Sequence, residues 1–392
     1  MYIKQFFLSL LIASLLFATS CSNDNSVKNS SEHQHINNAY KKDLFQVSLK
    51  YAKGFSVTYF DKYQRLNVYN PWKSGSNIGT YILVQKEDSV NIELKKGEIL
   101  LRLPLDRIAI MSVSNVGYFD LLKQLNRIAA VADEKRLYNK YLREGIALGS
   151  VQVLGNSASV NIEQLLVSKC DIFLQTAYES GSGKDQALID GGVKVVYNTD
   201  WMEKTPLARA EWVKFMGLLT NQNHRADSIF SMIENNYIQL KQLADTLDYK
   251  PDVLVGGLYK DVWYMPGGKS FKAHLLADAG TNYHWAHDST EGSLALSFEI
   301  VVDQQLNAPV WIEVPFKNKK ELLISDERYA YFDAFKVGTM FNNLKRTNAT
   351  GGNDYWEMGL CRPDEILADL IRIFHFEEME YDELKYYEKV SE

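Results

Sequence analysis

Residues 205–247 read TPLARAEWVKFMGLLTNQNHRADSIFSMIENNYIQLKQLADTL, and Gly217 is the only glycine or proline after Pro206. Thr205 and Pro206 suit the N-cap and the first position of a helix. Apolar residues then recur at helical spacing through the stretch. The pattern predicts one helix over residues 205–247, roughly 60 Å long at ~1.5 Å per residue. Two helices with a turn near residues 221–223 are the competing interpretation.

On both sides of this stretch, short apolar strands alternate with helices. Before it, we expect strands at residues 107–111, 128–131, 171–174 and 193–197. After it, we expect strands at residues 253–255 and 310–312 and helices at residues 270–279, 298–306 and 363–374. Such alternation indicates largely parallel sheets covered by helices. The predicted fold is therefore α/β, with two lobes at residues 105–204 and 248–384 joined by a long helix.

Residues 44–104 have a different pattern. Phe55–Tyr59 and Arg65–Tyr69 alternate apolar and polar residues, and the Asp61-Lys62 pair between them suggests a hairpin turn. Another strand is expected at residues 80–85. We expect an N-terminal β-rich extension of antiparallel strands packed against the first lobe, and the sequence suggests no function for it.

The N-terminus has the pattern of a lipoprotein signal. An apolar run at Phe6–Phe17 precedes small residues at 18–20 and then Cys21. We expect a signal peptide over residues 1–20 and a lipid on Cys21, although an ordinary secretory signal is the alternative. The polar residues 21–43 then form a flexible tether. The expected location is the bacterial cell envelope, anchored by lipid and facing the periplasm, with surface exposure left open.

Composition limits the function further. The chain has 392 residues and a formal net charge of −6, so its length suits two lobes and its charge disfavours nucleic acid as a partner. No stretch after residue 20 approaches the ~20 apolar residues of a membrane span. Cys170 and Cys361 could form a disulfide outside the cytoplasm, but burial as small hydrophobic side chains is favoured.

The two lobes contain a loosely repeated unit, a helix with glutamate in its first turn followed by an apolar strand. The first copy is NIEQLL at 161–166 with DIFL at 171–174, and the second is SFEIVV at 297–302 with PVWI at 309–312. Further pieces are RIAI at 107–110, PLARAEW at 206–212, MPGGKS at 265–270 and LLADAG at 275–280. Over residues 106–376 their order and spacing resemble the substrate-binding lipoproteins of ABC importers for ferric siderophores, haem and vitamin B12.

The resemblance implies a monomer that binds its ligand in the cleft between the lobes and delivers it to an ABC permease with a cytoplasmic ATPase. It implies that one surface glutamate in each lobe, Glu163 and Glu299, docks onto the permease. A glutamate in the first turn of a helix is also favoured by the helix dipole alone. No enzymatic activity and no cofactor are expected.

Loops after strand ends are where open α/β folds bind ligands. Flat aromatic side chains there suit a macrocycle or an aromatic chelator. The expected ligand contacts are Ser114, Asn115, Tyr118, Tyr178 and Glu179 in the first lobe and Trp263, Tyr264, Trp285, Tyr355 and Trp356 in the second. Several of these aromatics are expected to pack inside the lobes instead. His284 and His287 could ligate a metal, but loop histidines are commonly solvated, so no metal site is predicted.

The predicted function is capture of an iron chelate, either a ferric siderophore or haem, with a corrinoid such as cobalamin as the alternative. An extracytoplasmic metal-dependent enzyme and an adhesion or scaffold lipoprotein are alternatives from other classes. Gly268-Lys269-Ser270 resembles the end of a phosphate-binding loop, but Trp263 stands where that motif needs its first glycine. The sequence shows no other catalytic motif, which agrees with a binding protein.

Overall fold

The computed structural model describes residues 46–89, 91–179, 183–376 and 383–392. The predicted signal peptide, Cys21 and the tether at residues 21–43 lie outside these residues. The described residues form one compact unit. Within the described ranges, no helix has both the length and the apolar character needed to cross a membrane.

The first lobe contains a five-stranded parallel sheet in the order β11-β10-β5-β6-β7. Its strands are β5 (Ile108–Ile110), β6 (Ile128–Val131), β7 (Gln152–Val153), β10 (Ile172–Thr176) and β11 (Val195–Asn198). The connecting helices are α1 (Val116–Leu121), α2 (Lys140–Ala147), α3 (Ile162–Val167) and α4 (Gly183–Asp190). Residues of β5, β6 and β10 are buried without alternation, as expected for strands covered on both faces. The predicted α/β organisation of this lobe is confirmed.

The second lobe has less sheet. Its parallel pair, β12 (Val253–Val255) and β16 (Val310–Ile312), is extended by single bridges to Asn282 and Met340. A separate antiparallel sheet, which the sequence did not predict, contains β13 (Leu258–Tyr259), β14 (Val262–Pro266) and β15 (Ser293–Leu296). The helices are α8 (Phe271–Asp278), α9 (Phe298–Gln305), α10 (Lys319–Ser325), α11 (Asp333–Val337), α12 (Asp354–Glu357) and α13 (Pro363–Phe374).

Short elements complete the chain. Two-residue strands pair as β8 (Gly155–Asn156) with β9 (Ser159–Val160), and as β17 (Phe341–Asn342) with β18 (Glu388–Lys389). The 3₁₀ turns are at Val113–Asn115, Leu125–Arg127, Glu134–Arg136, Asp200–Met202, Glu327–Tyr331 and Gly359–Cys361. The residues that follow β5, Val113–Asn115, thus form a 3₁₀ turn.

The single helix predicted over residues 205–247 is wrong, and the turn near residues 221–223 is confirmed. The stretch forms α5 (Pro206–Ala210), α6 (Val213–Thr220) and α7 (Asn223–Asp245). Asn221 adopts a left-handed conformation with φ of 56° and ends α6, a role asparagine tolerates well. Gly217 lets Ala226 approach closely, because a Cβ at 217 would lie 2.6 Å from the Ala226 Cβ.

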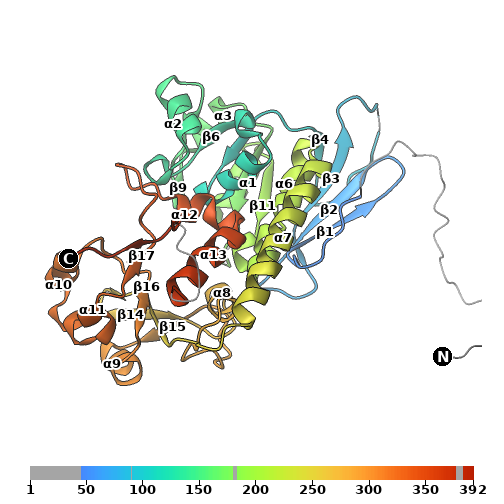
Figure 1. Cartoon of the computed structure of the whole chain (residues 1–392). Coiled ribbons are helices and arrows are strands. Elements are labelled where there is room, and N and C mark those ends of the chain that lie inside the picture. Colours follow the sequence, from blue (N-terminus) through green and yellow to red (C-terminus); the bar gives the residue numbers. More distant parts are fainter. Residues whose placement is uncertain (1–45, 90, 180–182, 377–382) are drawn as a thin grey trace, which may run out of the picture. The chain divides into compact units, whose positions relative to one another are not determined.

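Helix α7 is therefore the long helix that joins the two lobes. It packs on α6 at one end and on α8 and α13 in the second lobe. Figure 1 shows α7, in yellow, running from the N-terminal sheet and α6 toward α8. Its 23 residues correspond to ~35 Å at ~1.5 Å per residue, so a long helix joins the lobes, as predicted, but is shorter than expected.

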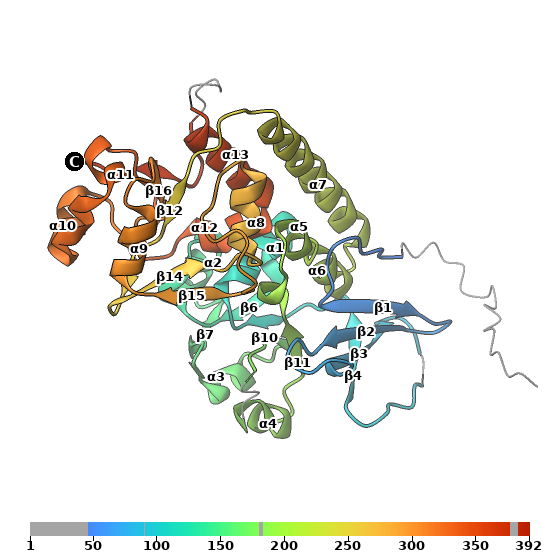
Figure 2. The same ribbon diagram turned by 90° about the horizontal axis from the view of Figure 1, so that it is seen from below.

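The N-terminal extension is a four-stranded sheet in the order β1-β2-β3-β4. Its strands are β1 (Phe55–Tyr59), β2 (Gln64–Tyr69), β3 (Asn77–Gln85) and β4 (Glu98–Leu103). The predicted hairpin is confirmed, but β4 pairs parallel to β3, because the chain crosses back before entering β4. The sheet lies beside β11 and α6 (Figure 2), and the Tyr197 amide donates to the Tyr81 hydroxyl at 2.9 Å.

The two cysteines of the described part do not form a disulfide. Cys170 is partly buried and Cys361 is fully buried, and both are free. Burial raises the pKa of the Cys361 thiol well above its usual range, so it stays protonated. Cys361 therefore acts as a small packing residue, as expected.

Candidate ligand-binding cleft

A cavity of about 550 Å³ lies between the lobes, a volume within the usual range for small-molecule sites. Trp201 follows β11, Gly256 follows β12 and Glu313 follows β16, so the cavity lies at the carboxyl ends of strands from both sheets. That edge is where open α/β sheets bind ligands. Helix α5 and the first turn of α8 contribute Arg209 and Lys272.

Large aromatic side chains form much of the wall. Trp201, Tyr264 and Trp356 line the cavity and are 38%, 49% and 47% exposed. The Trp201 indole N–H donates to the Ala177 carbonyl oxygen at 3.1 Å, and its ring lies 5.7 Å from the Tyr178 ring. Aromatic side chains exposed around one concavity are typical of binding sites.

One end of the cavity holds a buried polar cluster. The Lys272 ammonium donates to Glu313 and to the Tyr355 hydroxyl, and the Tyr355 and Tyr387 hydroxyls donate to Glu313 Oε1 at 2.9 and 3.1 Å. Glu313 has a φ of 55°, a strained conformation for a glutamate, which is typical of functional sites.

The electrostatics of this cluster fix its protonation. Burial disfavours the charge of Lys272, but the nearby Glu313 carboxylate outweighs burial and raises the lysine pKa. Burial, together with the charge of Glu313, raises the pKa of Tyr355 to about 12. At neutral pH Lys272 is therefore charged, and Tyr355 and Tyr387 are neutral.

The other cations that line the cavity, Lys204 and Arg209, are also paired. Arg209 Nε lies 3.1 Å from Asp200 Oδ2, and Lys204 of the first lobe lies 2.5 Å from Glu291 of the second. Burial raises the pKa of Glu203, which also lines the cavity. The cavity wall thus offers no net excess of either sign.

Three of the predicted ligand contacts, Tyr264, Tyr355 and Trp356, line this cavity. Tyr355 is fully buried, because its ring packs against Tyr386 and Tyr387. Tyr178 is exposed and packs against Trp201 at the edge of the aromatic wall. Contact of these residues with a ligand remains a prediction.

The structure places the other predicted contacts away from the cavity lining. Trp263 is fully buried among Phe298, Trp311, Tyr329 and Phe332, because successive residues of β14 face opposite sides and Tyr264 takes the open side. These aromatics form the core of the second lobe. The expectation that Trp263 presents its face to a ligand is therefore corrected.

Tyr118 and Asn115 are also fully buried. The Tyr118 hydroxyl lies 2.9 Å from the Arg209 carbonyl oxygen and 3.1 Å from Asp200, so it fastens α1 to α5. Trp285 packs on Tyr283 and His284, Ser114 is partly buried beside Ser112, and Glu179 is exposed after β10. None of these five lines the cavity, so they are not carried into the proposed site.

The two predicted docking glutamates are both exposed, in the first turns of α3 and α9. Asn161 and Ser297 cap these helices. Glu299 is 75% exposed and lies 3.6 Å from Arg328. Its own backbone amide and the Ser297 hydroxyl lower its pKa, so it is an anion at neutral pH.

Sequence reasoning missed several lining residues: Trp72, Trp201, Glu203, Lys204, Arg209, Lys272, Glu291 and Glu313. Glu313 directly follows one predicted strand and Trp201 lies four residues after another, so the strand-end rule could have found both. Lys272 lies two residues after the MPGGKS segment quoted for the resemblance. No such signal marks Trp72, which comes from the N-terminal sheet.

Comparison with known proteins identifies the family of this chain. The model of the periplasmic binding protein family matches residues 108–342, more than half of the chain. The chain belongs to the periplasmic binding protein family. This confirms the resemblance, and because the family is one of binding proteins, it also confirms that the chain is not an enzyme.

Individual relatives are distant. A lipoprotein of Methanocaldococcus jannaschii, itself uncharacterized, is 25% identical over 83% of this chain and 81% of its own length. A periplasmic haem-binding protein from Pseudomonas aeruginosa is 16% identical with a TM-score of 0.54, covering 74% of this chain and 99% of that one. A possible iron-binding periplasmic solute-binding protein from Staphylococcus epidermidis is 20% identical with a TM-score of 0.51, covering 69% and 99%. These two structures share the fold of this chain.

His284 and His287, the two histidines considered as metal ligands, lie in the loop between α8 and β15. Among the described residues, no group of three or more histidine, cysteine, aspartate or glutamate side chains is arranged to hold one. His284 packs edge-on against Trp285.

Proposed function

We propose that this protein captures an iron chelate, either a ferric siderophore or haem, in the interlobe cavity and delivers it to an ABC permease. The observation that supports this most is the convergence of exposed aromatic side chains from both lobes on one cavity. Flat, apolar faces with polar edges suit macrocycles and aromatic chelators. The fold shared with a haem-binding protein and a possible iron-binding protein supports the same class.

The paired charges of the cavity limit the net charge that a bound chelate can carry. A chelate with several negative charges would lose its hydration without meeting an unpaired cation, which is unfavourable. Chelates of low net charge fit the wall better. The same observation favours a corrinoid as the second candidate.

Delivery would use the exposed faces of α3 and α9. Beside Glu163, the side chains of Leu166 and Val167 are exposed, and Ile300 is exposed beside Glu299. A carboxylate next to apolar surface is suited to a specific protein contact. We propose that a membrane permease binds these two patches, one on each lobe.

The proposal also includes a lipid anchor on Cys21. A lipid on Cys21 and a tether over residues 21–43 would hold the binding unit in the cell envelope, facing the periplasm. That the matched relative from Methanocaldococcus jannaschii is named a lipoprotein supports this placement. Mass spectrometry of the mature protein from its native membrane should find a diacylglyceryl group on Cys21.

Tryptophan fluorescence tests the ligand class, because Trp201 and Trp356 line the cavity. We expect saturable quenching at one-to-one stoichiometry by one of four probes: haemin, a ferric hydroxamate, a ferric catecholate or cyanocobalamin. Tyr264→Ala should weaken that binding ~10-fold, the loss of one stacked aromatic contact. Tyr259→Ala, at an exposed tyrosine outside the cavity lining, is the matched control. Binding of none of the four probes would refute the proposal.

The docking proposal is tested separately by transport. Glu163→Gln and Glu299→Gln should abolish uptake of the bound chelate in cells while its affinity for the purified protein is unchanged. Glu321→Gln changes an exposed first-turn glutamate on α10 and serves as the control. Normal uptake by both docking variants would contradict the assignment.

A further inference from the structure

The N-terminal sheet lies outside the region matched by the family model, yet it reaches the ligand cavity. Trp72, in the turn between β2 and β3, lines the cavity together with Trp201. Their ring centroids are 6.3 Å apart at an interplanar angle of 46°. Since Trp201 also packs on Tyr178, the rings form one continuous aromatic surface shared by the sheet and the first lobe.

The turn that carries Trp72 is held by its own hydrogen bonds. Asn70 Oδ1 accepts from the amides of Trp72 at 2.9 Å and Lys73 at 3.0 Å, and the Asn70 amide donates to the Ser76 carbonyl at 2.9 Å. Gly75 supplies the positive φ, 74°, that the turn requires. The indole of Trp72 is therefore presented from a defined turn.

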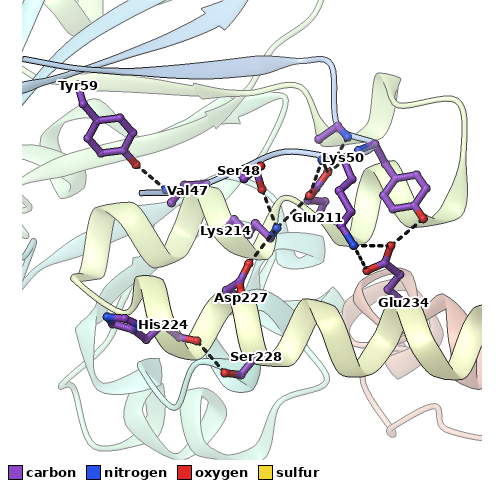
Figure 3. Close-up of polar contacts among 12 residues, drawn as sticks. Val47, Ser48, Lys50, Tyr59, Glu211, Lys214, His224, Asp227, Ser228 and Glu234 are labelled. Carbon is purple, nitrogen blue, oxygen red and sulfur yellow. Dashed lines mark hydrogen bonds and ion pairs between the residues drawn. The ribbon is translucent and has the colours of Figure 1, made fainter. Parts of the chain in front are cut away.

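The segment that precedes β1 is held by the buried carboxylate of Glu211. Glu211, at the end of α5, is fully buried and accepts the backbone amides of Lys50, Tyr51 and Ala52 at 2.8–2.9 Å. Lys214 lies 3.1 Å from the same carboxylate. Figure 3 shows Glu211 between Lys50 and Lys214.

A second pair of contacts reaches α7. The Lys50 ammonium and the Tyr51 hydroxyl donate to Glu234 at 2.9 and 2.8 Å, as Figure 3 shows for Lys50. Hydrogen bonds to charged groups of this kind are among the stronger ones in proteins. The segment leading into β1 is thus tied both to Glu211 at the end of α5 and to α7, the helix that joins the lobes.

A third contact links the sheet to the cavity wall itself. Glu203, which lines the cavity, accepts the backbone amides of Lys53 at 2.9 Å and Gly54 at 2.8 Å, and the Trp212 indole N–H at 3.0 Å. The approach is close, because a Cβ on Gly54 would lie 2.6 Å from the Trp212 ring. These contacts hold the segment that enters the sheet against Glu203 in the cavity wall.

We propose that the N-terminal sheet is a third wall of the ligand site, with Trp72 as a contact residue that restricts which chelates bind. This inference rests on the proposed function. A preformed aromatic surface costs no ordering on binding, so Trp72 favours chelates with a flat or apolar face on that side. It also gives residues 44–104 a role in ligand recognition.

The experiment is calorimetric titration of the full mature chain with the probe, among the four named above, that the unaltered protein binds most tightly. Trp72→Ala should weaken binding ~10-fold or more, and Trp72→Phe should stay within ~3-fold, because it keeps a ring on the same turn. The matched control is Tyr63→Ala, which removes an aromatic from the other hairpin turn of the same sheet, where it stacks on Phe60.

The outcomes separate the two proposals. Weakening by Trp72→Ala, with Tyr63→Ala unaffected, supports the third wall. Equal affinities for Trp72→Ala and the unaltered protein overturn it and leave the proposed function standing. If the unaltered protein binds no probe, the proposed function fails and this inference fails with it. Should Trp72→Ala not fold, Trp72→Lys decides in its place, since unchanged affinity with a charged, ring-free side chain would equally overturn the inference.

Discussion

Two of the contacts between the lobes differ in character. In one, Glu357 of α12 is 2% exposed and accepts the Tyr138 amide of the first lobe at 2.8 Å. In the other, the pair of Lys204 and Glu291 bridges the lobes beside the cavity, with side chains 57% and 55% exposed. Buried polar contacts are costly to break, whereas exposed ion pairs contribute little. The lobes should therefore separate at Lys204–Glu291 while the Glu357 contact holds.

The largest change in the free energy of unfolding is expected from a substitution that adds an atom next to the backbone of Glu357. A Cβ on Gly117 would lie 2.4 Å from the Glu357 carbonyl oxygen and 2.8 Å from Cys361 Sγ. Because the backbone at residue 357 can move only at an energetic cost, Gly117→Ala should lower the free energy of unfolding by about 3 kcal/mol. Thermal denaturation measures this loss.

The control lies at the exposed contact. Gly292, next to Glu291, has nothing within 4 Å of a built Cβ. Gly292→Ala should leave the free energy of unfolding within ~0.5 kcal/mol. Equal losses for the two alanine variants would contradict the difference between the contacts.

A smaller, pH-dependent effect is expected at Glu357. Burial raises the pKa of this carboxyl from 4.5 to about 8, with the nearby charges of Asp354 and Asp120 adding to the shift. Between pH 4.5 and about pH 8 the unfolded chain loses this proton while the folded one keeps it. The contribution of Glu357 to stability therefore falls as pH rises through this window and is constant outside it.

Glu357→Gln removes this titration and keeps a hydrogen-bond acceptor for Tyr138. The variant should match the unaltered protein at pH 4 and exceed its free energy of unfolding by about 2 kcal/mol at pH 6. Chemical denaturation at both pH values measures the difference. A constant difference across this range would show that Glu357 does not titrate as argued.

The smallest effect is expected at the exposed ion pair. In a double-mutant cycle with Lys204→Ala and Glu291→Ala, the coupling energy should be below about 1 kcal/mol and should decrease with added salt. A coupling of several kcal/mol that is insensitive to salt would mean that this contact holds the lobes as firmly as the buried one.

The sequence predicted the architecture well where periodicity carries the information. Four of the five strands in the parallel sheet of the first lobe, all except β7, and the helix at Pro363–Phe374 were predicted within a few residues, since buried parallel strands and amphipathic helices have strong patterns. The break at Asn221 was only an alternative, because Asn235 and Asn236 of the same stretch lie inside α7, so asparagine alone does not mark a break. The positive φ of Asn221 accompanies the packing of α6 on α7.

The site was predicted less well, because the side that a residue faces depends on neighbours that the sequence does not show. Trp263 and Tyr264 were both expected in the cleft, and strand alternation already requires that one of them point the other way. Which one points inward follows from the aromatic core around Trp263. Trp72 could not be found, since its place depends on carboxylates more than a hundred residues away in the chain.

The most direct test of the account is a crystal structure of the protein grown with whichever probe quenches its fluorescence. We predict electron density for that chelate between the lobes, in contact with Trp201, Tyr264 and Trp356. A chelate bound elsewhere on the protein, with the interlobe cavity filled only by water, would contradict the account.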